Sequence, residues 1–398
     1  MKKNLFMTAA AIAALLTGCS TDEEIANIET SAKNAIGFNI VSNSAETKAT
    51  IYGPNSKDFG FDVFAFDNLN NYFMGKEGEH GYTQNADHSF THDGVQIIPT
   101  DAGTWVYKNT EEVAYWPTTN SLNFYAVSPT NFSKSTSVPF TWSIKPSTKT
   151  ISYSTVDEFN NKEGNKNMDV MYAVAENQVK GTNGGIVKLH FKHILSQVLF
   201  KAKVQYEAMT VTIKDMKIHN FAAGGTFTIP EGEPAQSHWG DTTPWLFIYT
   251  TKKEKTDISA STTKTEEAVW ITPKADPMLF VHQKLTKWET TSGSSFTKKQ
   301  GDDSKQSYLE IEMKLAQNGQ YVIGSENEYK TIYVPFTNID DNNVTGWEPG
   351  KRYIYTLNFG GGYDDQGKPI LTPITFDAKV TDWKDASGYT EQIPAYTN

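Results

Sequence analysis

Apolar and polar residues alternate over many short segments of this chain, and this period of two constrains its fold more than any other feature. Within residues 35–41, the apolar side chains Ile36, Phe38 and Ile40 all fall on one face of an extended chain. No segment of comparable length carries apolar residues at the spacing of an amphipathic helix. The sequence therefore predicts an all-β protein.

Other short segments are rich in β-branched and aromatic residues and are bounded by turn residues. In the first half they are 59–66, 105–107, 113–116, 122–127, 151–156 and 170–174. In the second half they are 211–218, 225–229, 246–249, 269–271, 278–281, 308–315, 331–336, 353–359 and 374–380. Residues 67–104 are polar and are expected to be mainly loop, and residues 186–204 have the length of two strands or of one strand that crosses between sheets. Short strands at this spacing predict β-sandwiches rather than a parallel α/β sheet.

A glycine-rich segment at residues 181–185 is the clearest break in the middle of the chain. A chain of 398 residues is long enough for two or three domains, and we favour two. We therefore expect one domain at residues 35–185 and a second at residues 186–398, which ends in a C-terminal tail.

The N-terminus has the pattern of an export signal. Two lysines precede an apolar run over residues 5–16, and Gly18 precedes Cys19, which is the only cysteine in the chain. The run is too short to span a bilayer as a finished helix, so we expect residues 1–18 to be a signal peptide. Leu-x-Gly-Cys at this place resembles a bacterial lipoprotein signal, which implies that Cys19 is acylated. The alternative is a stray cysteine behind a plain signal peptide.

Acidic residues stand shortly behind this cysteine, at Asp22, Glu23 and Glu24. We expect residues 19–34 to form an acidic tether because they show no apolar periodicity. One interpretation is a solvated leader that keeps the domain off the membrane. The other is a resemblance to the signal that sends lipoproteins of the Bacteroidales to the outer face of the outer membrane.

The composition excludes several classes of function. The chain is acidic, with 46 acidic against 36 basic residues, and Arg352 is its only arginine. Such a chain is a poor binder of nucleic acid. With one cysteine, it forms no internal disulfide.

Signals for catalysis are weak. The chain has no Gly-x-Ser-x-Gly elbow and no thiol in the expected domains. The histidines His80, His88 and His92 lie near Asp93, but in a polar segment without helical spacing, which makes them a weak candidate for a metal site. We therefore predict a protein that is not an enzyme and has no cofactor, no catalytic residues and no metal site.

Four sequence blocks carry a family resemblance. They are Ala114-Tyr115-Trp116-Pro117 and the blocks over residues 122–129, 190–198 and 347–355. In this order, behind a lipoprotein start, they resemble the fimbrillin-like (minor-fimbrillin type) lipoproteins of the Bacteroidales, which are type V pilus subunits. The resemblance implies two tandem transthyretin-like Greek-key β-sandwich domains, a location on the cell surface in a fimbrium, and a lipid anchor in the outer membrane.

The resemblance also implies a route of assembly. A trypsin-like protease cuts the lipidated precursor behind its first strand, and a segment of a neighbouring fimbrial subunit, in a homopolymer or a heteropolymer, takes the place of that strand. Here the displaced strand maps to Ile36, Phe38 and Ile40, and the cut to Lys48-Ala49. Family members commonly have arginine at the cut. Either the protease accepts lysine, or this subunit is an anchor or another unprocessed component.

The C-terminal tail is the candidate donor segment. Its bulky side chains are Tyr389, Ile393 and Tyr396, and Pro394 removes one donor from a strand ladder. The alternative is a last strand on its own domain, followed by a frayed end.

For the whole protein, the alternative is a surface lipoprotein that does not polymerise and binds glycans or host adhesion ligands. Tryptophans beside polar loops would then stack on sugars, and the candidates are Trp239, Trp245 and Trp288.

Overall fold

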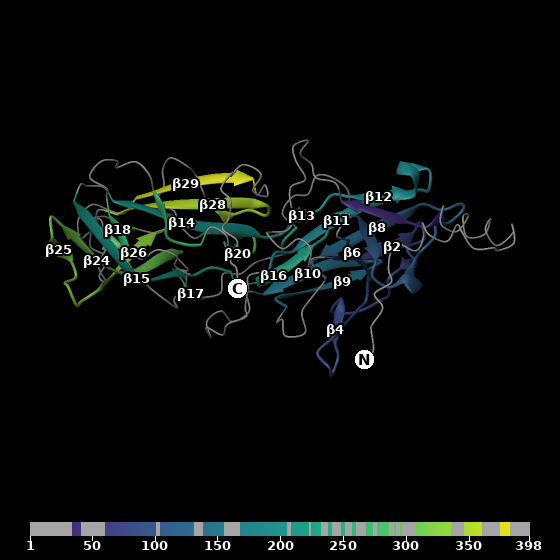
Figure 1. Ribbon diagram of the computed structural model, residues 1–398, viewed down its shortest axis with the longest axis horizontal. Coiled ribbons are helices and arrows are strands. Elements are labelled where there is room, and N and C mark those ends of the chain that lie inside the picture. Colours follow the sequence, from purple (N-terminus) through teal and green to yellow (C-terminus); the bar gives the residue numbers. More distant parts are fainter. Residues whose placement is uncertain are drawn as a thin grey trace, which may run out of the picture.

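The structure is a computed structural model that describes most of the chain between residues 34 and 382. The described ranges are 34–40, 60–100, 104–130, 138–154, 168–204, 208–222, 224–231, 238–240, 248–250, 257–259, 268–273, 277–285, 290–291, 295–296, 307–335, 346–359 and 375–382. Within them, regular structure is almost entirely β-strand, as predicted. Two short 3-10 helices are η2 (Thr110–Glu112) and η4 (Thr182–Gly185). Figure 1 shows an elongated molecule with one group of sheets at each end.

The N-terminal group is built around one central sheet. Its strand order is β13-β11-β8-β2-β6-β7, with β3 also paired to β2. The strands are β2 (Phe61–Asp67), β3 (Tyr72–Met74), β6 (Val95–Pro99), β7 (Trp105–Tyr107), β8 (Leu122–Ser128), β11 (Met171–Gln178) and β13 (Lys192–His193). Residues 61–66 of β2 are all buried, on both faces of the strand. A strand in the middle of this sheet is therefore covered from two sides.

Two smaller sheets supply this cover. On one face lie β1 (Gly37–Ile40) and β12 (Ile186–Leu189), and on the other lie β9 (Phe140–Lys145), β10 (Thr148–Ser154) and β16 (Gly224–Thr228). A hairpin of β4 (Tyr82–Gln84) and β5 (Phe90–His92) lies beside them. Strands β12, β13 and β16 follow residue 185 in the sequence, yet they pair with strands that precede it.

The C-terminal group is a sandwich of two sheets. One sheet has the order β19-β14-β28-β29, with β20 on β14, and the other has the order β17-β15-β24-β25, with β18 on β15 and β26 on β24. The strands of the first sheet are β14 (Ser196–Val204), β19 (Val269–Trp270), β20 (Met278–Phe280), β28 (Lys351–Phe359) and β29 (Thr375–Asp382). Those of the second are β15 (Met209–His219), β17 (Ile248–Thr250), β18 (Asp257–Ser259), β24 (Tyr308–Gln317), β25 (Gln320–Ile323) and β26 (Lys330–Pro335). Two further pairs are β21 (Gln283–Lys284) with β27 (Gly346–Trp347), and β22 (Thr290–Thr291) with β23 (Ser295–Phe296).

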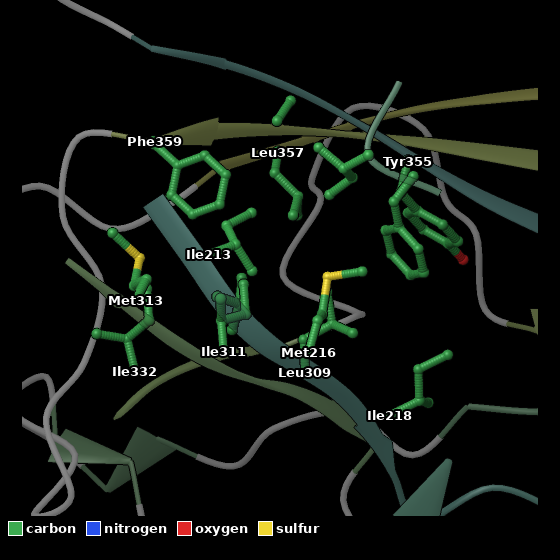
Figure 2. Close-up of a cluster of buried hydrophobic side chains, with 14 of the residues drawn as sticks. Ile213, Met216, Ile218, Leu309, Ile311, Met313, Ile332, Tyr355, Leu357 and Phe359 are labelled. Atoms are coloured by element: carbon green, nitrogen blue, oxygen red, sulfur yellow. The ribbon is translucent and has the colours of Figure 1, made fainter. Parts of the chain in front are cut away.

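One apolar cluster fills the space between these two sheets. Side chains of β15, β24 and β26 point toward those of β28, as Figure 2 shows for Ile213, Ile311 and Leu357. Strand β28 alternates buried and partly buried residues from Tyr353 to Phe359. The period of two in the sequence is therefore the pattern that places one face of each strand in the core.

Several sequence expectations differ from the structure. Residues 67–104, expected to be mainly loop, contain strands β3 to β6. Residues 113–116, expected to be a strand, form only an isolated bridge at Tyr115. Residues 186–204 form the three strands β12, β13 and β14 instead of one or two.

A carboxylate in the second sandwich sheet predicts a pH dependence of stability. Glu310 Oε2 lies 3.0 Å from Nε2 of the buried His219, and Lys217 Nζ lies 3.3 Å from Glu310 Oε1. Contact with His219 lowers the pKa of Glu310 to about 2, against its partial burial, which acts in the opposite direction. The unfolded chain has the ordinary pKa of 4.5. The ionised Glu310 carboxylate therefore stabilises the folded chain fully above pH 4.5. This stabilisation is lost as the pH falls from 4.5 toward 2.

We expect Glu310→Gln to remove this part of the acid sensitivity. The wild-type chain should lose about 1–2 kcal/mol more than the variant between pH 6 and pH 2.5, a value discounted for the partial exposure of the carboxylate. Urea denaturation at a series of pH values measures the difference. If the free energies of unfolding of the two proteins changed with pH in the same way, Glu310 would not be the source of this acid sensitivity.

Candidate functional site

Strand β1 lies in a slot between two segments that are distant in sequence. On one side it runs parallel to β12, with Phe38 opposite Val187 and Ile40 opposite Leu189. On the other side it meets residues 114–116. The Ile36 N–H donates to the Ala114 carbonyl at 2.9 Å, and the Trp116 N–H donates to the Asn34 carbonyl at 2.9 Å. The segment is thus held by main-chain pairing with β12 along one edge and by two main-chain hydrogen bonds at its N-terminal end on the other.

Side chains on the inner face of β1 fill apolar pockets. Ile36 is 1% exposed and Phe38 is 7% exposed. The Phe38 ring lies 6.0 Å from the ring of Phe61 and 5.9 Å from those of Tyr107 and Phe124, measured between ring centroids. Each buried side chain of this size contributes about 1.5–3 kcal/mol through the area removed from water. The slot therefore takes two large apolar side chains, two residues apart.

Trp116 connects the two walls of this slot. Its main-chain N–H bonds to residue 34, ahead of β1, while its indole Nε1–H donates to the Gly185 carbonyl at 2.9 Å, just ahead of β12. Gly185 has a φ of 85°, and a Cβ atom there would lie 3.3 Å from the indole nitrogen. Glycine is therefore favoured at this position by its backbone conformation and by the close approach of the tryptophan.

Tyr107 supplies a polar contact at the inner edge of the slot. Its hydroxyl donates to the Ile36 carbonyl at 2.9 Å. Burial raises the pKa of Tyr107 well above its usual value, so this hydroxyl keeps its proton. The Tyr107 hydroxyl is thus a hydrogen-bond donor at neutral pH.

The structure brings together part of what the sequence singled out. Ile36 and Phe38 face inward, as the alternation predicts, and Ile40 is partly buried at the end of β1. The sequence did not identify Trp116, Tyr107 and β12 as partners of this strand. The lipidation candidate Cys19, the cleavage candidates Lys48 and Ala49, and the donor candidates Tyr389, Ile393 and Tyr396 lie outside the described residues.

Other polar candidates take part in local contacts. The weak metal candidate His92 has its Nδ1 2.8 Å from Asp62 Oδ2, and the Thr130 hydroxyl donates to Asp62 Oδ1 at 2.5 Å. Burial raises the pKa of Asp62, while the contact with His92 opposes that shift. Among the residues that the structure describes, no three His, Cys, Asp or Glu side chains are arranged to hold a metal ion.

The glycan hypothesis loses one of its three tryptophans. Trp239 is buried, and its indole N–H donates to the Ile194 carbonyl at 3.0 Å. A buried ring offers no face to a sugar. Trp245 and Trp288 lie outside the described residues. In the described part of the chain, no helix has the length and apolar character needed to cross a membrane.

A comparison with solved structures finds several chains that resemble this one to different degrees. A fimbrial protein of Bacteroides vulgatus is 16% identical, with a TM-score of 0.53 over 88% of this chain and 99% of that one. A Bacteroides uniformis protein proposed to act in cell adhesion is 11% identical, with a TM-score of 0.45 over 88% and 97%. The tip fimbrial protein Mfa3 of Porphyromonas gingivalis, truncated at its C-terminus, is 11% identical, with a TM-score of 0.37 over 82% and 95%. A comparison with curated proteins finds no match.

A comparison with protein-family models identifies the chain. The model described as fimbrillin-like matches residues 47–383, which is most of the sequence. This agrees with the resemblance drawn from the four sequence blocks and with the all-β architecture. The chain therefore belongs to the fimbrillin-like family.

Proposed function

We propose that this chain is a subunit of a cell-surface fimbria that exchanges its first strand for a segment of a neighbouring subunit. The observation that carries this proposal is the place of β1. It lies in an outer two-stranded layer and not in the ladder of the central sheet. Its removal therefore breaks none of the hydrogen bonds that join β2, β8 and β11.

Loss of β1 would create a surface that favours a replacement. The rings of Phe61 and Phe124 and the side chains of Val187 and Leu189 would lose their cover. The edge of β12 would also lose its main-chain partner. An inserted strand restores the hydrogen bonds and the apolar contacts together, so binding of such a segment is strongly favoured over an open edge.

The geometry of the slot specifies what it accepts. A replacement that reproduces the contacts of β1 is extended, runs parallel to β12, and carries two large apolar side chains two residues apart, as Ile36 and Phe38 do. In the tail of this chain, Ile393 is followed two residues later by Ala395. This tail supplies one of the two side chains, so a tail from a different subunit with two large apolar residues fits better.

Export and anchoring complete the proposal. The signal at residues 1–18 directs export, and acylated Cys19 anchors the precursor in the outer membrane, with the acidic tether at residues 19–34 between the anchor and the fold. A trypsin-like protease then cuts between Lys48 and Ala49 and releases β1. Because each subunit receives a segment from the next, the contact does not close on itself and yields a fibre.

The substitution Lys48→Arg allows an arginine-specific protease to cut the chain selectively behind β1. Arg352 is the only arginine, and its Nε donates to Gln197 Oε1 at 2.6 Å inside the sheet, on a strand paired on both sides. In Lys48→Arg, an arginine-specific protease should therefore cut after residue 48. We expect the cut protein to form a ladder of oligomers in size-exclusion chromatography, and an excess of a synthetic peptide of residues 35–41 to suppress the ladder by filling the slot.

Two controls make this result specific. Wild-type protein treated with the same protease should remain whole and monomeric. A peptide that carries Ile36→Asp and Phe38→Asp should fail to suppress the oligomers, because a carboxylate in an apolar pocket is strongly disfavoured. A cut Lys48→Arg protein that loses its β-sheet circular dichroism, or that neither forms oligomers nor binds the peptide of residues 35–41, would contradict strand exchange and leave a surface protein of another kind.

A further inference from the structure

Three groups in the wall of the slot hydrogen-bond to the main chain near the start of β1. The Ala114 carbonyl accepts the Ile36 N–H at 2.9 Å, and the Trp116 N–H donates to the Asn34 carbonyl at 2.9 Å. The Tyr107 hydroxyl donates to the Ile36 carbonyl at 2.9 Å. All three groups lie behind the candidate cut in the sequence, so they stay with the subunit when β1 is released.

The Tyr107 hydroxyl lies between two main-chain groups. Burial raises the pKa of Tyr107, and a hydrogen bond from the main chain of Ala114 opposes that rise. An N–H group has this effect because it stabilises the ionised phenol, so the Ala114 N–H is the donor. Residue 36 is therefore bonded to residue 114 through both its N–H and its carbonyl, once directly and once through the tyrosine.

The following residues of β1 are paired along one edge in the described part of the chain. Residues 37–40 pair with β12, while Ile36 directs its N–H away from β12. Successive residues of a strand direct their N–H groups to opposite edges, so the Phe38 N–H also points away from β12. No hydrogen bond joins that N–H to a described residue. The wall opposite β12 thus contacts the main chain at residues 34 and 36.

We propose that Tyr107 and residues 114–116 form a register clamp, which fixes how far an inserted segment lies along the slot. The clamp accepts a segment that offers an N–H and a carbonyl at the position of Ile36, the clamped position. A shift by one residue would turn the outward side chains into the apolar pockets. Proline at the clamped position is rejected, because it leaves the Ala114 carbonyl without a donor. This specificity rests on the proposed strand exchange, which supplies the segment.

The clamp disfavours the tail of this chain as a donor. The aromatic pocket, which Phe38 fills, receives Tyr396 only when Pro394 lies at the clamped position. It receives Ile393 only when Glu391 lies there, and a carboxylate is disfavoured in an apolar pocket. With Tyr389 in the aromatic pocket, a serine replaces the isoleucine of β1. The slot therefore selects a segment of a different subunit over a copy of this chain.

Peptides with a single ester bond test the clamp on the cut Lys48→Arg protein. In a fluorescent peptide of residues 34–41, an ester in place of the amide ahead of Ile36 removes its N–H and keeps every side chain. The apparent Kd against the resident strand should rise about tenfold in fluorescence anisotropy. An ester ahead of Phe38 is the matched control. It removes an N–H that bonds to no described residue, so the Kd should rise less than about threefold.

Two tyrosine variants test the same contact from the side of the protein. Tyr107→Phe should weaken binding of the unmodified peptide several-fold and accelerate hydrogen exchange at Ile36 in the uncut chain. Tyr82→Phe is the matched control, because the Tyr82 hydroxyl also donates to a main-chain carbonyl, that of Phe140, at 3.0 Å. It packs against the apolar cluster on the other face of the central sheet, so both readouts should stay unchanged.

Each outcome decides between the clamp and strand exchange. Equal losses of affinity for the two ester peptides, or equal exchange at Ile36 in the two tyrosine variants, would overturn the clamp and leave strand exchange standing. A peptide of residues 387–398 that bound as tightly as residues 34–41 would overturn the selection against this chain's own tail. A cut protein that bound none of the peptides would contradict strand exchange itself, and the clamp with it.

Discussion

Phe38→Ala is expected to lower the free energy of unfolding by about 3–5 kcal/mol, the usual range for removing a phenylalanine ring from a packed core. The ring is almost fully buried and packs edge-on against Phe61, Tyr107 and Phe124. Its loss leaves a cavity bounded by rings of the central sheet, which do not collapse readily because their strands are paired. Urea denaturation of the whole chain, followed by circular dichroism, measures the change.

Ile40→Ala is the matched comparison on the same strand. Ile40 is only partly buried and lies at the end of β1, so its truncation should cost about 1 kcal/mol or less. If both variants lost the same stability, β1 would be held by its main chain rather than by its pockets. A replacement strand would then need no particular side chains, and the sequence requirement proposed for the donor would be wrong.

Much of the fold could be predicted because its longer strands have a local pattern. Strands β8 and β28 lie where the sequence places them, since alternating side chains or continuous apolar runs specify which faces are buried. The short strands β3 and β5 could not be found in this way. They have three residues each, lie in polar segments and depend on their partners β2 and β4. Their conformation is thus fixed by pairing across the sheet and not by propensity.

The sequence predicts the strand that fills the slot but not the segments that form its walls. Alternation alone identifies Ile36 and Phe38 as one face of a strand. It does not say that β12 lies beside that strand, because the parallel pair joins residues about 150 positions apart in the chain. The sequence features that belong to the walls of the slot are the block at residues 114–117 and the glycines at residues 181–185. The contact between them, from the Trp116 indole to the Gly185 carbonyl, required the structure.

Trp116→Ala is expected to lower the free energy of unfolding by about 3–5 kcal/mol and to loosen β1 and β12 together. Trp116→Phe keeps most of the ring but leaves the Gly185 carbonyl without its indole donor, which should cost about 1–3 kcal/mol. Hydrogen exchange followed by mass spectrometry should show faster exchange at Ile36, whose N–H bonds to the Ala114 carbonyl beside Trp116.

A tryptophan in the other group of sheets separates this local effect from a general loss of stability. Trp347 is fully buried in the C-terminal sandwich, where its indole N–H donates to the Tyr355 hydroxyl at 3.0 Å. Trp347→Phe should also destabilise the chain, yet it should leave exchange at Ile36 unchanged. If both substitutions accelerated exchange at Ile36 equally, β1 would open only when the whole chain unfolds. A strand with that behaviour could not be released by a single cut behind it, because the remaining contacts would have to break at the same time.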